Sequence, residues 1–467
     1  MVAMHFKQFY DTDLAQGSYL LACQQTGQAV VVDPRRDVAV YLAEAAAKRL
    51  RIVAVTETHI HADYLSGARE LAQSAQAPLY LSNEGGEQWQ YRFDHLPLRD
   101  GDLISLGSVE LKAVHTPGHT PEHIAFLVTD RSLTDEPGYL LSGDFVFVGD
   151  VGRPDLLDEA AGEVGSRFVA ARELFRSLKD NFLTLGDHLQ VWPGHGAGSA
   201  CGKALGAVAS TTVGYERRTA WWRGYLEAGD VDGFVEELLA GQPDAPSYFG
   251  RMKRQNRDGP ARLGERPKLK RMTAAELVGR VNRDLILIDT RPTRVVWTDS
   301  VPGALTIPGG TSFATYASWV LDPEADPREI VLLAKDEATA LNLRDRLGYI
   351  GVDRVTAYVT DLQGLERRPV PLISPKELDR ASGLHLVDVR AAGEFALGAI
   401  PGAAQIHAGR LLARLDELPR GGKLVLNCRS GPRASVVASA LRARGFSNVL
   451  ELEGSYEAWL AKGRERV

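Results

Sequence analysis

The amino-acid sequence predicts an α/β protein, and its 467 residues suit about three domains of roughly 150 residues each. In the first half, short apolar runs alternate with helical patterns, and clusters of His and Asp follow several of these runs. In the last two hundred or so residues, an internal repeat divides the chain again. We therefore predict domains at residues 1–265, 266–368 and 369–467, with polar sites on loops at strand ends.

The composition is that of an ordinary globular protein, with 44% hydrophobic residues, 24% charged residues and a net charge of −6. Nucleic-acid binding would need a basic patch, and the sequence shows none. No apolar run reaches the roughly 18 residues of a membrane span. The N-terminus has no secretory-signal pattern. Three widely spaced cysteines, Cys23, Cys201 and Cys428, imply no disulfide framework, so we expect a cytoplasmic protein.

The first domain is predicted to alternate strands and helices. Apolar runs at 17–22 and 29–33 predict strands, and the alanine-rich segment 39–50 predicts a helix. A buried strand at Arg51–Thr56 and a helix at 65–75 flank a polar loop. Further strands are expected at 78–81, 103–106, 109–114 and 139–141, and a long helix at 159–178. Residues 205–265 have helical patterns, and the polar segment 253–270 is predicted to be a linker.

The repeat is defined by two aspartates at strand ends. Asp289 ends LILID and Asp388 ends LHLVD, and in both copies a Pro-Gly-Ala sequence begins 13 residues later. A second matched segment leads into Ala334 in one copy and into Cys428 in the other. Each copy has about a hundred residues of alternating strand and helix, which favours one small α/β domain with a parallel sheet.

The first domain also contains a concentration of metal-ligand residue types. His59, His61 and Asp63 lie within five residues, directly after a strand. The candidate ligands are His59, His61, Asp63, His115, His119, His123, Asp144 and His195. Imidazole and carboxylate suit zinc or iron, and the absence of cysteine from this set argues against a structural zinc site.

At these residues the chain resembles the metallo-β-lactamase superfamily, over residues 1 to about 240. The resemblance implies an αββα sandwich. That superfamily usually has His-x-His-x-Asp-His and two metal ions, but here Tyr64 stands in place of the last His. A ligand of the second metal is therefore missing, which counts against a two-metal thioester hydrolase of the glyoxalase II type.

Within the superfamily, the chain is most similar to the persulfide dioxygenase branch, through its THIHAD, PGHT, GD and GRPD segments. That resemblance implies one Fe(II) per chain, with zinc less favoured, held by His59, His119 and Asp144. This facial set leaves positions for O₂ and a substrate sulfur. Arg153 is expected to contact the anionic part of the substrate or to order Asp155. The residues expected to surround the metal ligands are His61, Asp63, Tyr64, Asp155 and His195.

The second site is the loop Cys428-Arg429-Ser430-Gly431-Pro432-Arg433, between a strand at Lys423–Asn427 and a helix starting near residue 434. Backbone N–H groups at such a turn lower a thiol's pKa and favour a bound anion. We expect Cys428 to be a nucleophile, with Arg429, Ser430, Gly431 and Arg433 binding its substrate. The alternative is a buried free cysteine, which does not need two arginines and a glycine turn.

Residues 370–467 resemble the rhodanese family of sulfurtransferases, with Ala399 where that family often has His. The short cysteine loop fits sulfur transfer better than the phosphatase chemistry of related folds. In the first copy, at about 271–365, Ala334 replaces the cysteine, and Asp336 and Glu337 would repel an anion. We therefore predict two rhodanese-like α/β domains with parallel sheets, the first of them inactive and acting as a spacer or docking surface.

Together the resemblances imply a persulfide dioxygenase–rhodanese fusion for sulfide detoxification or sulfur metabolism. The first domain would oxidise a low-molecular-weight persulfide with O₂ to sulfite. Cys428 would interconvert persulfide and sulfite with thiosulfate, in either direction. The alternatives are a two-zinc glyoxalase II-like hydrolase fused to a rhodanese, or a sulfur-carrier or redox-sensing protein. The expected partners are these small molecules, and assembly as a homo-oligomer is left open by the sequence.

Overall fold

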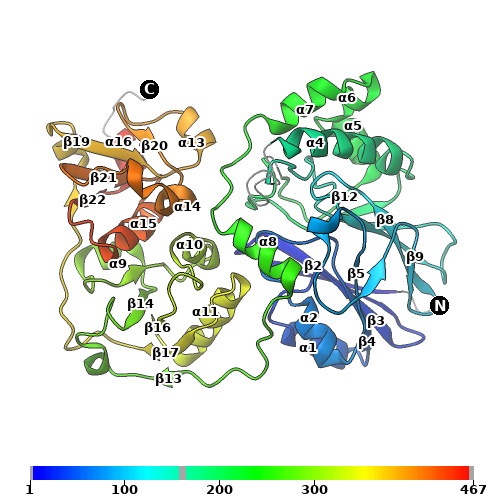
Figure 1. The fold of residues 1–467 in the computed structure, drawn as a ribbon, viewed down its shortest axis with the longest axis horizontal. Coiled ribbons are helices and arrows are strands. Elements are labelled where there is room, and N and C mark those ends of the chain that lie inside the picture. The colour runs from blue at the N-terminus through cyan, green and yellow to red at the C-terminus, as the bar shows by residue number, and fades with distance from the viewer. Residues whose placement is uncertain (1–3, 157–164, 204, 462–467) are drawn as a thin grey trace. The chain divides into compact units, whose positions relative to one another are not determined.

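The computed structural model describes residues 4–156, 165–203 and 205–461 (Figure 1). By its contacts the chain divides into two compact units. Unit 1 contains Met1–Gln242 and Phe249–Gly264, and unit 2 contains Pro243–Tyr248 and Glu265–Val467. Among the described residues, no helix combines the length and the apolar character that crossing a membrane requires.

Unit 1 is built on two six-stranded sheets. The first contains, in spatial order, β1 (His5–Asp11), β2 (Gln16–Cys23), β3 (Gln28–Val32), β4 (Arg51–Thr56), β5 (Leu79–Ser82) and β6 (Leu96–Leu98). The second contains β7 (Leu103–Ser105), β8 (Val109–His115), β9 (Ile124–Asp130), β10 (Tyr139–Gly143), β11 (Gln190–Pro193) and β12 (Thr211–Thr212), also in spatial order. From β3 to β6 the strands are parallel, as is the β10–β11 pair, so their carboxyl ends lie at common sheet edges.

Helices cover the outer faces of both sheets. The helices of unit 1 are α1 (Ala39–Ala47), α2 (Ala68–Ala75), η1 (Glu87–Trp89), α4 (Ser166–Ser177), η2 (Leu178–Phe182), α5 (Val213–Thr219), α6 (Arg223–Ala228), α7 (Val231–Leu239) and α8 (Phe249–Asp258). Leu21 of the first sheet and Phe126 of the second share the core between the sheets. Tyr41 and Leu71, on α1 and α2, pack on the outer face of the first sheet, and α4 and α7 pack on that of the second. The predicted αββα sandwich is confirmed.

Unit 2 contains two five-stranded parallel sheets with the same strand order. The first runs β13 (Lys270–Arg271), β17 (Val355–Val359), β16 (Glu329–Leu333), β14 (Leu285–Asp289), β15 (Leu305–Thr306). The second runs β18 (Leu372–Ile373), β22 (Val449–Leu452), β21 (Lys423–Asn427), β19 (Leu384–Asp388), β20 (Ala404–Gln405). This matching topology confirms the internal repeat.

In both copies, the aspartate that defines the repeat pairs with the arginine two residues after it. Asp289 ends β14 and pairs with Arg291 at 2.7 Å, and Asp388 ends β19 and pairs with Arg390 at the same distance. The helices of unit 2 are η3 (Ala274–Leu277), α9 (Thr293–Thr298), α10 (Phe313–Val320), α11 (Glu337–Tyr349), α12 (Pro375–Leu378), α13 (Ala392–Ala396), α14 (Ala408–Leu411), η4 (Leu412–Glu417), α15 (Pro432–Ala443) and α16 (Ser455–Leu460).

Two expected segments differ from the structure. Residues 253–258, predicted as part of a linker, form the end of α8 instead. The polar composition of α8 hides a buried face, on which Met252, Lys253 and Asn256 lie. Of the helix expected at 159–178, residues 159–164 lie outside the described residues, and the rest corresponds to α4 and the first residue of η2.

Candidate metal centre and cysteine loop

His59 is held by a chain of hydrogen bonds that begins at Asp33. Both residues follow neighbouring parallel strands, β3 and β4, so their loops meet at one sheet edge. The Thr58 hydroxyl donates to Asp33 Oδ2 at 2.9 Å and lies 3.0 Å from His59 Nδ1. Because that hydroxyl has a single proton, it accepts from His59 Nδ1–H, and the lone pair of His59 is therefore on Nε2.

His119 is oriented in the same way by a backbone carbonyl. It lies on the loop between β8 and β9, and its Nδ1 is 3.0 Å from the carbonyl oxygen of Arg153. Nδ1 must donate to that oxygen, so Nε2 is the atom available for a metal.

Asp144 follows β10, after a sharp turn at Gly143. Gly143 has a φ of 51°, and a Cβ there would lie 2.7 Å from both His123 Nε2 and the Thr58 side chain. Glycine is therefore required where the chain passes between these two loops. The Asp144 N–H donates to His123 Nε2 at 3.0 Å, which fixes the start of the turn.

These three side chains converge on one point. Asp144 Oδ2 lies 3.9 Å from His59 Nε2 and 3.5 Å from His119 Nε2. All three residues are buried, and one ligand atom from each lies within 4.8 Å of the others. Asp144 Oδ2 has no hydrogen-bond partner among the described residues. An orphaned carboxylate oxygen facing two lone pairs fits a bound metal ion, since a buried anion otherwise needs a partner.

Burial keeps the two histidines in the neutral form that binds metals. It lowers the pKa of His59 well below its usual value, and the neighbouring His61 lowers it further. Burial also lowers the pKa of His119, although Asp144 opposes that shift. Neutral imidazole is the ligand form of histidine.

Beside the triad, His195 bridges two carboxylates. Its Nδ1 lies 2.8 Å from Asp144 Oδ1, and its Nε2 lies 2.8 Å from Asp63 Oδ2. Burial alone would lower the pKa of His195, but the charge of Asp144 raises it well above its usual value. Asp63, His195 and Cys201 form a second group whose ligand atoms lie within 4.8 Å of one another. Sequence reasoning left Cys201 out, because nothing near it in the chain marks a site.

His61 and Tyr64 lie beside the triad and both contact Asp33. His61 Nε2 lies 3.1 Å from Asp33 Oδ1; burial alone would lower the pKa of His61, but Asp33 raises it to about 9. The Tyr64 hydroxyl donates to the Asp33 carbonyl at 3.2 Å and accepts from Gln16. Neither side chain is in the His59–His119–Asp144 group.

Arg153 is a buried cation that pairs with Asp155. Its guanidinium pairs with Asp155 and donates to the Ala200 carbonyl at 2.9 Å, and its side chain is 2% exposed. Of its two expected roles, these contacts fit the ordering of Asp155. Its backbone carbonyl is also the one that orients His119.

Two residues that hold this loop were missed by sequence reasoning. Asp33 could have been found, because a carboxylate following a strand next to β4 must lie near the loop. Asn256 could not, because it contacts the loop from α8, nearly two hundred residues away in the chain.

The cysteine loop of unit 2 lies between β21 and α15, as the sequence predicts. Cys428 is 1% exposed, and its sulfur accepts a hydrogen bond from the Gly431 N–H at 3.1 Å. The Ser455 hydroxyl accepts from the Cys428 N–H at 3.1 Å. Gly431 has a φ of 121°, which lets its amide point at the sulfur.

The two arginines of the loop differ in burial. Arg433 is mostly buried and pairs with Glu394 through two contacts, at 2.5 and 2.9 Å. Arg429 pairs with Glu457 at 2.7 Å, and like Ser430 it is exposed. Both arginines therefore have a glutamate as counter-charge, but only Arg429 and Ser430 are exposed to solvent.

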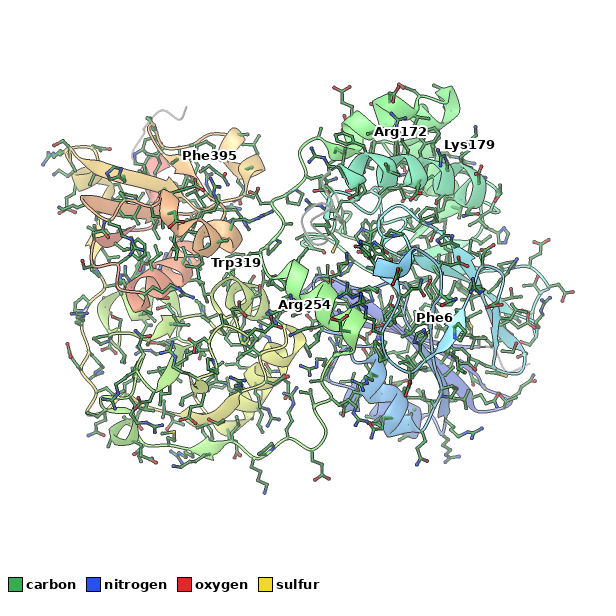
Figure 2. All side chains as sticks on the ribbon, in the orientation of Figure 1. Phe6, Arg172, Lys179, Arg254, Trp319 and Phe395 are labelled. Atoms are coloured by element: carbon green, nitrogen blue, oxygen red, sulfur yellow. The ribbon has the colours of Figure 1, made fainter. Side chains whose placement is uncertain are left out.

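The first repeat contributes to the surroundings of this loop. A Cβ at Gly431 would lie 2.8 Å from the indole ring of Trp297, which projects from α9. The Trp297 N–H donates to the buried carboxylate of Glu451 at 2.9 Å. Trp319 of α10, labelled in Figure 2, packs against His407 in the second repeat, with ring centroids 5.5 Å apart. The loop is thus enclosed by both copies.

The matching loop in the first repeat has a different structure. Ala334 directly follows β16, and Asp336 caps α11 by accepting from the Thr339 N–H at 2.8 Å. A carboxylate of the chain itself therefore occupies the helix N-terminus that an anionic substrate would need.

Fold and site together define an αββα protein with a buried His–His–Asp metal group, followed by a tandem of parallel-sheet domains of which one has a cysteine loop. The Metallo-beta-lactamase superfamily model matches residues 12–195, and the Rhodanese-like domain model matches residues 374–462. The chain belongs to the metallo-beta-lactamase superfamily and has a C-terminal rhodanese-like domain.

Three similar proteins are informative. A metallo-beta-lactamase structure from Staphylococcus aureus subsp. aureus COL is 36% identical, with a TM-score of 0.68; the match covers 77% of this chain and 100% of that one. A hydroxyacylglutathione hydrolase of Polaromonas sp. is 32% identical over 38% of this chain and 61% of its own length. The mitochondrial persulfide dioxygenase of Bos taurus is 25% identical over 40% of this chain and 67% of its own length.

Proposed function

We propose that unit 1 is an iron-dependent persulfide dioxygenase that oxidises a low-molecular-weight persulfide with O₂ to sulfite. The observation that carries this proposal is the buried three-ligand group of His59, His119 and Asp144. Tyr64, which stands where a further histidine ligand would be needed, has its hydroxyl bonded to the Asp33 carbonyl. The similarity to a persulfide dioxygenase adds support.

Within this proposal, the chain orients the ligands and keeps water out. Asp33 and Thr58 set the tautomer of His59, and the Arg153 carbonyl sets that of His119. His195 holds one oxygen of Asp144, so that the other faces the two imidazoles. A bound Fe(II) would supply the one-electron chemistry with O₂ that no protein side chain here provides.

We propose that Cys428 is a sulfurtransferase nucleophile. Its thiolate attacks the outer sulfur of thiosulfate or of a persulfide, and the S–S bond breaks as sulfite or a thiol leaves with the bonding electron pair. The persulfide so formed on Cys428 passes its outer sulfur to sulfite or to a thiol by the reverse exchange. The Gly431 N–H stabilises the thiolate in both steps.

The two proposed reactions share an intermediate. Unit 1 would release sulfite, and a Cys428 persulfide accepts sulfite as its partner. Placing both sites on one chain raises the effective concentration of each site's product at the other.

Metal content and oxygen consumption test the dioxygenase proposal. The full chain is purified without oxygen, iron and zinc are counted per chain, and glutathione persulfide is added in an oxygen electrode. We expect about one iron per chain and oxygen uptake that depends on persulfide. Two zinc ions per chain, no oxygen uptake and cleavage of a glutathione thioester would instead identify a hydrolase.

That hydrolase is the second candidate function, because the group of Asp63, His195 and Cys201 offers a place for another metal ion. The similarity to a hydroxyacylglutathione hydrolase points the same way. Against it, His195 Nδ1 already faces Asp144, and neither His61 nor Tyr64 turns toward this group.

Replacing Trp297 with alanine is expected to lower kcat/KM for thiosulfate about tenfold. The change removes the ring over Gly431 and one hydrogen bond to the buried Glu451, and a hydrogen bond to a charged group contributes roughly 1.5 kcal/mol or more. The kcat/KM for thiosulfate is measured from steady-state rates of sulfur transfer to cyanide. Val295→Ala, on the exposed side of the same helix, is the control and should leave kcat/KM unchanged. Equal rates for wild type and Trp297→Ala would contradict the assigned role.

A further inference from the structure

We propose that Asn256, on α8, is a positioning residue of the metal centre: it fixes the backbone from His61 to Ser66, the part of the loop that presents Asp63 to His195. This inference rests on the proposed metal site in unit 1, but not on the reaction that the metal supports. The segment around Asn256 has the composition of a linker, and no motif marks it as part of a site.

The side-chain amide of Asn256 makes three hydrogen bonds to this loop. Its Nδ2 donates to the carbonyl oxygens of His61, at 2.7 Å, and Tyr64, at 2.8 Å. Its Oδ1 accepts from the Ser66 N–H at 2.9 Å. Asn256 is 1% exposed, so these contacts are made in the protein interior.

These contacts matter because the loop has little regular structure of its own. It lies between the end of β4 at Thr56 and the start of α2 at Ala68. Buried peptide groups in such a segment need partners, and each unsatisfied group costs roughly 1–3 kcal/mol. Asn256 satisfies three of them, on both sides of Asp63.

The start of the loop is fixed by different groups. Thr58 N–H donates to Asp33 at 2.7 Å, and Ile60 N–H donates to the buried carboxylate of Glu122 at 2.8 Å. His59 is therefore held from its own side by the sheet edge, whereas the stretch from His61 to Ser66 depends on α8. Without Asn256, that stretch would retain the His61–Asp33 contact and, at its far end, the backbone bridge between Ser66 and Arg35.

The segment that includes α8 is itself anchored to unit 1. Glu70 on α2 accepts from the N–H groups of Leu263, at 2.8 Å, and Gly264, at 3.1 Å. Arg36 donates to the Ala261 carbonyl at 2.6 Å. The Nδ2 and Oδ1 atoms of Asn256 therefore project from a helix that is fixed to unit 1. A residue that supports metal ligands must itself be held in place.

A positioning role and a merely structural role predict different measurements. If Asn256 only stabilised the fold, its loss would lower the melting temperature of the metal-free protein and leave the metal affinity of the folded protein unchanged. If it positions the loop, the metal affinity must fall, because Asp63 in this stretch holds His195, and His195 in turn holds the ligand Asp144. Residues that orient metal ligands typically contribute 10–100-fold in affinity.

The test measures Co(II) dissociation constants by chelator competition, on full-length Asn256→Ala, Asn256→Asp and wild type, together with the Co(II) absorption spectrum. We expect the dissociation constant to rise about 10–100-fold in both variants, with altered Co(II) bands. Asn256→Asp keeps the size and the acceptor for Ser66 but cannot donate to the two carbonyls, and it decides the question if Asn256→Ala does not fold.

Glu70→Ala is the matched control, because it removes two hydrogen bonds from the same segment without touching the loop. It should change the dissociation constant by less than about threefold. Unchanged Co(II) affinity and bands in the Asn256 variants, or an equal loss in Glu70→Ala, would overturn the proposal. If wild type binds metal but consumes no oxygen, the dioxygenase proposal fails and this comparison still stands.

Discussion

Asp144→Ala is expected to reduce bound iron from about one ion per chain to less than a tenth, and to abolish persulfide-dependent oxygen uptake. Asp144 is the only carboxylate among the three proposed ligands, and its Oδ2 is the atom that faces both imidazoles. Removing it leaves two neutral histidines, which cannot balance the charge of a divalent ion in a buried site.

Elemental analysis and an oxygen electrode measure this effect on variants purified together. Asp130→Asn is the control: Asp130 is also a buried carboxylate, but it accepts hydrogen bonds from Ser132 and Met4 instead. Its variant should keep wild-type iron and oxygen uptake. Full iron content in Asp144→Ala would place the metal elsewhere, and the Asp63–His195–Cys201 group would be examined next.

Cys428→Ser should lower sulfur transfer from thiosulfate about a thousandfold or more and leave oxygen uptake at the wild-type level. A serine hydroxyl is a far weaker nucleophile toward sulfur, and it cannot hold a persulfide. After incubation with thiosulfate, mass spectrometry should find one added sulfur atom on the Cys428 peptide of wild type and none on that peptide in the variant.

Cys23→Ser is the control for losing a buried thiol, since Cys23 lies on β2 in unit 1 and should not affect sulfur transfer. Ala334→Cys supplies the opposite test. We expect it to create no activity, because Asp336 already caps the helix that would receive the anion. Transferase activity in a Cys428→Ser, Ala334→Cys double variant would show that the first copy is inactive only for want of a cysteine.

The sequence predicts correctly those features that depend on a few neighbouring residues, such as a site residue at the end of a strand. His59 follows a buried strand, His119 lies in a Pro-Gly-His-Thr turn and Asp144 follows Gly143, so each could be placed at a strand end. Cys428 stands between a strand and a helix, and the strand, loop and helix are all found in the structure. Strand ends meet at sheet edges, which is why local patterns sufficed to predict convergence.

The sequence does not predict contacts between segments that are far apart in the chain. Trp297 and Glu451 meet only because two copies of one fold pack together, and Asn256 reaches the metal loop only because α8 returns to the first sheet. No sequence motif surrounds any of these three residues, so the local sequence does not mark them. The helical character of residues 253–258 was missed for the same reason, because its buried face contains Lys253 and Asn256, polar side chains that look like a solvated segment.

The contact between the two repeats gives the first copy a structural role. The Thr306 N–H donates to Ser439, and the Asn282 side chain donates to the Ala443 carbonyl, so the first copy supports the helix that follows the cysteine. We therefore expect the first copy to act as a scaffold for α15, through Trp297, Thr306 and Asn282. A chain that lacks residues 266–368 should lose this support for the cysteine loop, whatever the chemistry of the first copy.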